Sequence, residues 1–180
     1  MGKILIVKTS LRANSNSDYL ADILLEQLQK EGEDVVSVSL KGKHIAFCHG
    51  CLVCQKKGAC VIKDDASTIS HMMHDADTIV FATPVYYYGL SGQMKTLLDR
   101  SNWLYASDYK FRNVYLVATA AENDDSAVDK TITNLEGWVE CFLKAKLQGV
   151  LRGVGLEEPL DAKNNKALLE KAYLFAQSIH

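Results

Sequence analysis

The sequence predicts an α/β protein built around a parallel sheet. Short apolar segments without polar alternation recur along the chain, and such segments are typical of strands buried on both faces. Segments with apolar residues at helical spacing lie between them. Because parallel neighbours must be joined by a crossover, usually a helix, this alternation favours βαβ units over hairpins.

Five strands are expected, and the glycine-interrupted last one is expected at an edge of the sheet. The predicted strands are Lys3–Thr9, Asp34–Leu40, Thr78–Thr83, Asn113–Thr119 and Gln148–Val154.

Five helices are expected between and after these strands. The first begins at Ser15, which can form a capping box with Asp18, and it ends near Gly32. The others are predicted over Asp64–His74, up to about Arg100, over a long stretch from Val128 to Phe142, and over Lys163–Ile179. No linker or repeat interrupts the pattern, so we expect one domain over residues 1–180.

Composition excludes several classes of protein. The 180 residues are 48% hydrophobic and carry a net charge of −2, which is not the composition of a disordered chain. The near-neutral charge argues against nucleic acid as a partner. The apolar runs are too short to span a bilayer, and the N-terminus runs straight into a strand without a secretory signal. We therefore expect a cytoplasmic protein without membrane insertion.

The loop after the first strand predicts a phosphate site. In parallel sheets, ligands bind beyond the carboxyl ends of the strands. Here hydroxyls, amides and one guanidinium gather before a helix N-terminus, where free N–H groups favour an anion. The group consists of Ser10, Arg12, Asn14, Ser15, Asn16 and Ser17. Neither a dinucleotide fingerprint nor a P-loop is present, and a polar surface loop that caps the helix is the alternative.

The loop after the third strand carries three consecutive tyrosines. Pro84 keeps the residue before it extended, and Tyr86, Tyr87 and Tyr88 would suit the edge of a flat aromatic ligand. The alternative is that the tyrosines pack on neighbouring helices or at a subunit interface.

These two loops resemble a known family. Residues 9–17 (TSLRANSNS) and 83–100 (TPVYYYGLSGQMKTLLDR) look like the corresponding motifs of the flavodoxin-like NAD(P)H-dependent FMN reductases, with Thr9 and Leu11 departing from the first motif. The resemblance implies a flavodoxin-like sandwich with strand order 2-1-3-4-5 and helices on both faces. It also implies bound FMN, NAD(P)H as co-substrate and a homodimer or homotetramer.

The resemblance assigns roles to the loops. The group from Ser10 to Ser17 named above would hold the FMN phosphate. The residues expected to line the flavin ring are Pro84, Val85, Tyr86, Tyr87, Tyr88, Gly89, Thr119, Ala120 and Ala121.

Four cysteines fall within thirteen residues. A reducing compartment rarely keeps disulfides, so Cys48, Cys51, Cys54 and Cys60 are available as thiols. Their segment is similar to that of the iron–sulfur flavoproteins of the same superfamily, which implies a [4Fe–4S] cluster. A closed zinc site and an ordered lid without metal are the alternatives. The fifth cysteine, Cys141, is expected to be a small buried residue in a helix.

The function that these patterns favour is an FMN-dependent NAD(P)H oxidoreductase that passes electrons to a flavin, quinone or similar acceptor. Hydride transfer takes place on the flavin itself, so no catalytic side chain is expected. Two alternatives stay open: an iron–sulfur flavoprotein that relays electrons between FMN and a ferredoxin-type partner, and a non-enzymatic flavin-binding module.

Overall fold

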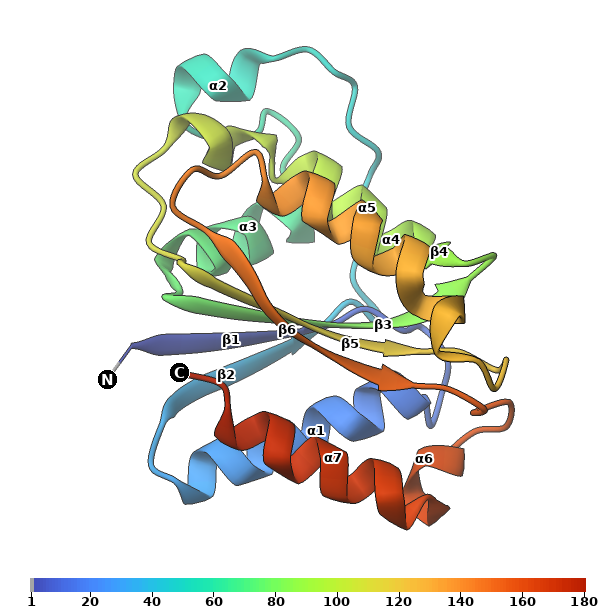
Figure 1. Cartoon of the computed structure of the whole chain (residues 1–180). Coiled ribbons are helices and arrows are strands. Elements are labelled where there is room, and N and C mark those ends of the chain that lie inside the picture. The colour runs from blue at the N-terminus through green and yellow to red at the C-terminus, as the bar shows by residue number, and fades with distance from the viewer. Residues whose placement is uncertain (1) are drawn as a thin grey trace.

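The predicted strands form one parallel sheet in the computed structural model, which describes residues 2–180 (Figure 1). Its order is β2-β1-β3-β5-β6, with a short β4 paired to β3. This confirms the expected order 2-1-3-4-5, since β4 forms only a hairpin with the end of β3. The strands are β1 (Lys3–Lys8), β2 (Asp34–Ser39), β3 (Thr78–Tyr86), β4 (Gly89–Leu90), β5 (Asn113–Thr119) and β6 (Lys146–Gly153).

Helices cover both faces of the sheet, with α3, α4 and α5 on one face and α1, α6 and α7 on the other (Figure 1). The α-helices are α1 (Asn16–Lys30), α2 (Val53–Lys57), α3 (Asp65–Asp75), α4 (Gly92–Arg100), α5 (Asp129–Val139), α6 (Asp161–Asn164) and α7 (Lys166–Gln177). Two 3₁₀ helices, η1 (Asn102–Ala106) and η2 (Asp125–Val128), join α4 to β5 and β5 to α5.

The sequence of β1 is continuously apolar because both of its faces are buried. Leu5 and Val7 belong to the apolar cluster on the α3–α5 face, whereas Ile4 and Ile6 belong to the cluster on the α1–α7 face. Successive side chains of a strand point to opposite faces, so a strand covered on both sides has no polar position.

The long predicted helix is shorter than expected. It ends at Val139, and the chain then turns so that Phe142 packs against Tyr109 and Phe111, with ring centroids 5.1 and 5.0 Å apart. The prediction that Cys141 is buried is therefore wrong, because this residue is exposed in the turn. The last predicted helix is likewise divided, with Asn165 capping α7 after the short α6.

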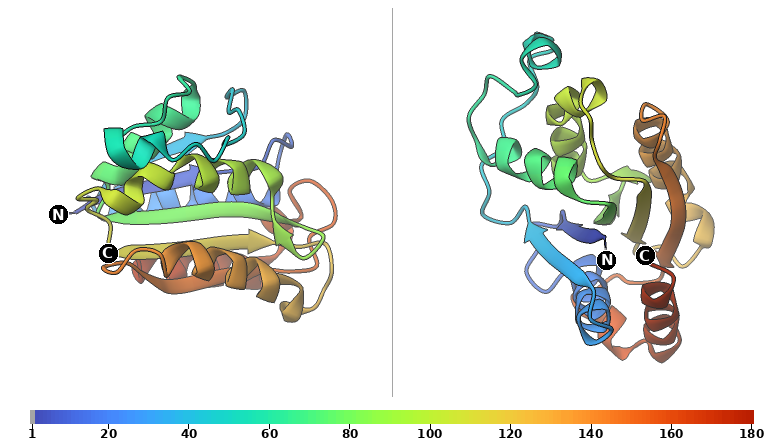
Figure 2. Two further views of the ribbon diagram at one scale, coloured as in Figure 1. Left: turned by 90° about the horizontal axis from the view of Figure 1, so that it is seen from above. Right: turned by 90° about the vertical axis from the view of Figure 1, so that its left-hand side faces the viewer.

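The cysteine segment, residues 46–62, lies outside the two helix layers. It follows the edge strand β2, and α2 packs on η1 above α3 (Figure 2). Both figures place α2 toward the end of the molecule opposite the β3–β4 hairpin. Gly58 ends α2 with a φ of 66°, in the left-handed region that favours glycine. In residues 2–180, no helix is long and apolar enough to cross a membrane.

Candidate functional site

A cavity of about 220 Å³ lies at the carboxyl ends of β1, β3 and β5. We call it the strand-end cavity. It brings together nine of the predicted site residues, which come from three separate loops. Its walls are formed by Ser10, Arg12, Ser15, Asn16, Pro84, Val85, Tyr86, Thr119 and Ala121, together with Leu156 and Glu157.

The phosphate-side wall is the start of α1. Ser15 is the N-cap, and its Oγ accepts a hydrogen bond from the N–H of Asp18 at 3.4 Å. The Oγ atoms of Ser15 and Ser17 lie 2.9 Å apart. The first N–H groups of a helix have no partner within the helix, so these hydroxyls stand beside free donors and the positive end of the helix dipole.

Asn16 lines the cavity, but its side chain is occupied by the protein. Its Nδ2 donates to the carbonyls of Leu156 and Glu158, at 3.4 and 2.8 Å, and its Oδ1 accepts from the N–H of Ala162. The amide therefore fastens the loop after β6 to α1. This explains how Leu156 and Glu157, which sequence reasoning missed, come to line the cavity.

A buried hydroxyl network supports the cavity from below. The Oγ of Ser91 lies 3.3 Å from Oγ1 of Thr9 and accepts from Oγ1 of Thr83 at 3.2 Å. All three residues are fully buried. The network ties the carboxyl ends of β1 and β3 to the N-cap of α4, so the loops that form the walls start from fixed points.

The ring-side wall is the end of β3, which runs three residues further than predicted. Pro84 and Val85 are half-buried, and Tyr86 is 48% exposed at the mouth. Tyr87 and Tyr88 form the tip of the hairpin with φ values of 50° and 63°. Side chains other than glycine or asparagine are strained in this region.

The hairpin tip directs its two tyrosines away from the strand-end cavity. Tyr87 is fully exposed. Tyr88 donates to a carboxylate oxygen of Glu122 at 2.7 Å, and Nζ of Lys130 lies over its ring, 5.5 Å from the centroid. The bond to Glu122 raises the pKa of Tyr88. The other predicted site residues outside the cavity walls are Asn14, Ser17, Gly89 and Ala120.

Charges beside the phosphate-side wall are of both signs. Arg12 is exposed and its Nη1 donates to the carbonyl of Glu157 at 3.3 Å. Lys8 pairs with Asp22 at 2.7 Å. Burial raises the pKa of Asp18 to about 6 against the opposing effect of Lys8, and one carboxylate oxygen of Asp18 has no hydrogen-bond partner in residues 2–180.

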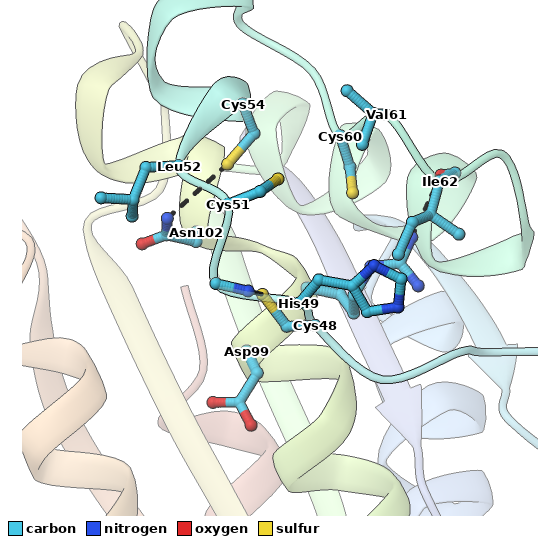
Figure 3. A pocket seen from close by; sticks show the side chains of 12 residues that line it. Cys48, His49, Cys51, Leu52, Cys54, Cys60, Val61, Ile62, Asp99 and Asn102 are labelled. Atoms are coloured by element: carbon cyan, nitrogen blue, oxygen red, sulfur yellow. Dashed lines mark hydrogen bonds between the residues drawn. The ribbon is translucent and has the colours of Figure 1, made fainter.

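The four clustered cysteines line a second, separate cavity. Cys48 and Cys51 precede α2, Cys54 lies in it, and Cys60 follows it, so the segment folds back on itself (Figure 3). Asn102 of η1 contacts Cys54, with Nδ2 3.6 Å from Sγ. We call this the cysteine cavity. His49, in the same segment, is exposed.

The cysteine thiols surround a space and do not meet at one point. Over residues 2–180, no three histidine, cysteine or carboxylate side chains are placed to hold a single metal ion. The closed tetrahedral site that zinc requires is therefore not formed by these side chains. A cubane cluster, by contrast, binds one thiolate at each of four separate corners.

The cysteine segment is held at both ends by one buried ion pair. Arg100, at the end of α4, contacts Asp64 with Nη1 2.6 Å from Oδ2 and Nη2 2.9 Å from Oδ1. The same guanidinium donates to the carbonyls of Ala46 and Ile62 at 2.7 and 3.1 Å. Burial raises the pKa of Asp64, but hydrogen bonds from Arg100 and the N–H of Ala46 outweigh it and lower that pKa overall.

The sequence matches a known protein family. The family model described as NADPH-dependent FMN reductase matches residues 2–146, which include both loops of the strand-end cavity from β1 and β3. The chain belongs to the NADPH-dependent FMN reductase family.

Several relatives that the chain matches are named iron-sulfur flavoproteins. An iron-sulfur flavoprotein of Archaeoglobus fulgidus is 36% identical over 91 residues, which are 51% of this chain and 41% of that protein. An iron-sulfur flavoprotein of Methanosarcina thermophila is 29% identical over 138 residues, which are 76% of this chain and 72% of that protein. The chain spans about half the length of most curated relatives that it matches.

The fold is shared with solved structures. An azoreductase from Bacillus anthracis superposes with a TM-score of 0.75 over 99% of this chain and 100% of the azoreductase, at 16% identity. Because the identity is low, this similarity shows only that this FMN reductase family member shares the flavodoxin-like fold.

Proposed function

We propose that the chain, acting as one flavodoxin-like domain over residues 1–180, is an FMN-dependent NAD(P)H oxidoreductase. In this proposal electrons pass to a free flavin, a quinone or a similar small acceptor. The observation that carries it is the strand-end cavity, in which a hydroxyl-rich helix N-terminus and an apolar wall face one space in a member of the FMN reductase family.

The phosphate-side wall fits the phosphate of FMN. Ser10, Ser15 and the first-turn N–H groups of α1 are donors, and Arg12 adds a cation at the rim. A phosphomonoester has three terminal oxygens that each accept hydrogen bonds, so its binding site needs several donors. We infer that Asn14 and Asn16 shape the wall without donating: Asn14 adopts a φ of 55°, and the Asn16 amide is already satisfied.

The ring-side wall fits the isoalloxazine ring. Pro84 and Val85 offer an apolar surface, Tyr86 stands at the mouth, and Thr119 and Ala121 line the cavity beside them at the end of β5. FMN, when bound, supplies the hydride and electron chemistry. The chain's residues position the ring, keep water from its apolar face and leave the side next to the exposed Tyr87 open to a second substrate.

Rapid mixing under anaerobic conditions tests this function. FMN-loaded protein is mixed with NADPH or NADH, and the loss of flavin absorbance is followed. We expect at least one nucleotide to bleach the flavin and an added quinone to restore the absorbance. If neither nucleotide bleaches bound FMN, the oxidoreductase proposal fails and a non-enzymatic flavin-binding module takes its place.

A second function is favoured by the cysteine cavity. Four thiols line one space, the buried Nε of Arg100 in its wall has no acceptor, and relatives named iron-sulfur flavoproteins match the chain. We propose that Cys48, Cys51, Cys54 and Cys60 hold a [4Fe–4S] cluster, which would relay single electrons between FMN and a ferredoxin-type partner. Anaerobically prepared protein should then contain about four irons and four sulfides per chain. Absence of both contradicts this second function.

We also propose a cytoplasmic homodimer or homotetramer without a nucleic-acid partner. The support is the family resemblance, the net charge of −2 and the exposed apolar side chains Leu52, Tyr105 and Leu143. Light scattering coupled to size exclusion measures the assembly directly, and a monomer at micromolar concentration would contradict it.

A further inference from the structure

Arg100 uses four of its five N–H groups on the protein. Its side chain is fully buried, and that of its partner Asp64 is 4% exposed. Both terminal nitrogens donate twice, to the Asp64 carboxylate and to the carbonyls of Ala46 and Ile62. This arrangement explains how the cysteine segment is anchored, but it leaves the fifth donor unexplained.

The fifth donor is Nε, which is buried and has no acceptor in residues 2–180. A buried donor without a partner destabilises the folded state, and more so when it belongs to a charged group. Such groups are rare in native proteins, and an unseen ligand is one of the recognised reasons for them. We therefore ask which acceptor could pair with Nε.

Sulfur is the acceptor that the cysteine cavity offers. Arg100 lines the cysteine cavity together with all four clustered cysteines. Cys60 lies two positions before Ile62, whose carbonyl accepts from Nη2 of Arg100 at 3.1 Å, so the chain brings this cysteine beside the guanidinium. The guanidinium is a permanent cation, and a thiolate accepts a hydrogen bond better than a thiol.

We propose that Nε of Arg100 donates a hydrogen bond to the sulfur of Cys60 when that sulfur ligates an iron–sulfur cluster, and so positions the cluster and raises its reduction potential. This inference rests on the second function proposed above. It makes Arg100 a positioning residue, because the guanidinium acts through the sulfur of Cys60 and not on a substrate.

The direction of the effect follows from charge. Reduction adds an electron to a cluster that is already anionic, and a donor at a ligand sulfur stabilises that added charge. Removing the donor should make the potential more negative. A purely structural role, in which Arg100 only anchors residues 46 and 62, would leave the potential of a loaded cluster unchanged.

The test is Arg100→Lys, which keeps the charge beside Asp64 but has no Nε. Arg112→Lys is the matched control, because Arg112 donates to the carbonyls of Tyr109, Lys110 and Phe111, away from the cysteines. Wild type and variants are loaded anaerobically with ferrous iron and sulfide. Three quantities are measured: iron retained against a chelator, the cluster potential by EPR-monitored titration, and FMN content as an independent sign of folding.

We expect Arg100→Lys to bind iron roughly 10–100-fold more weakly, the usual effect of losing an outer-shell partner, and to shift the cluster potential negative. FMN content and the Arg112→Lys protein should match wild type. If Arg100→Lys fails to fold, the neutral pair Arg100→Gln with Asp64→Asn replaces it, with the same expectation.

Two results overturn the inference and are distinguishable. A wild-type chain that takes up no iron and sulfide removes the cluster itself and this role with it. A wild-type chain that takes up the cluster while the Arg100 variants keep its potential and iron retention removes only the role of Arg100.

Discussion

The two cavities of this protein are built in opposite ways. The strand-end cavity takes its walls from loops that leave the ends of β1, β3, β5 and β6, all fixed by the sheet. The cysteine cavity is formed by a segment that is largely without regular structure and that depends on one buried pair, Arg100 and Asp64. We therefore expect ligand binding in the strand-end cavity to depend on many weak contacts. The stability of the cysteine cavity should depend mainly on the one contact between Arg100 and Asp64.

Removing the buried pair should have the largest effect on stability. Arg100→Ala leaves the Asp64 carboxylate buried without a partner, and we expect a loss of about 3–5 kcal/mol in the free energy of unfolding, measured by urea denaturation. Lys95→Ala is the control on the same helix, since its exposed pair with Asp99 should be worth under about 0.5 kcal/mol. Equal losses in the two variants would show that the buried pair contributes no more to stability than an exposed one.

The buried pair also predicts a pH dependence. Because the pKa of Asp64 is lowered in the folded state, its contribution to stability is complete above its ordinary pKa near 4. That contribution is lost as the pH falls through the lowered value. The difference in unfolding free energy between wild type and Asp64→Asn should therefore be constant from pH 6 to 8 and shrink in acid.

Hydroxyls at the start of α1 test whether contacts in the strand-end cavity are individually weak. Ser15→Ala combined with Ser17→Ala should weaken FMN binding by about 1–3 kcal/mol, the scale of hydrogen bonds to a charged group. Asn165→Ala removes the cap of α7 at a similar cost in helix stability, about 1 kcal/mol, and should leave FMN affinity unchanged. FMN affinity that is unaltered in the double variant would rule out this wall as the phosphate site.

The buried carboxylate beside that wall gives a smaller effect of opposite sign. The pKa of Asp18 is raised to about 6, so its ionisation opposes folding fully above pH 6 and not at all below about pH 3.8. Asp18→Asn should therefore stabilise the protein near pH 7.5, by about 1 kcal/mol once partial exposure is discounted, and leave stability unchanged near pH 3.5. Asp22→Asn, which breaks the pair with Lys8, should show no such gain. Thermal unfolding at the two pH values measures this.

The smallest expected effect concerns the hairpin tip. Tyr87 is exposed and strained at a φ of 50°, so Tyr87→Gly should raise the free energy of unfolding by roughly 0.5 kcal/mol, because relief of strain exceeds the added chain entropy. The same change should slow oxidation of NAD(P)H if the side chain contacts the second substrate. Tyr105→Gly, at an exposed aromatic residue in η1, should destabilise instead.

The sheet was predictable because its strands are covered on both sides. Segments such as KILIVK and NVYLVAT have no polar face, and helical spacing separates them, so the order of elements follows from the sequence. The ends of elements were less predictable. Phe142 continues the helical spacing of α5, yet it is buried by an aromatic cluster beyond the end of that helix.

The loops also divide into features that the sequence predicts and features that it does not. Nine predicted residues line the strand-end cavity because the rule about carboxyl ends of strands was applied to the loops after β1, β3 and β5. Leu156 and Glu157 were missed, although applying that rule to β6 would have found them. The direction of Tyr87 and Tyr88 depends on two consecutive left-handed residues, and the partnership of Arg100 with Asp64 spans 36 positions, so neither carries a local sequence signal.

If FMN binds at the strand-end cavity independently of the cysteine cavity, an FMN titration of two proteins will show it. FMN is added to apoprotein, with its fluorescence followed, for wild type and for a variant with Cys48, Cys51, Cys54 and Cys60 all changed to serine. We expect one FMN per chain in both proteins, with the same affinity. Loss of affinity in the serine variant would contradict the separation of the two cavities, and absence of binding in both would contradict the proposed function.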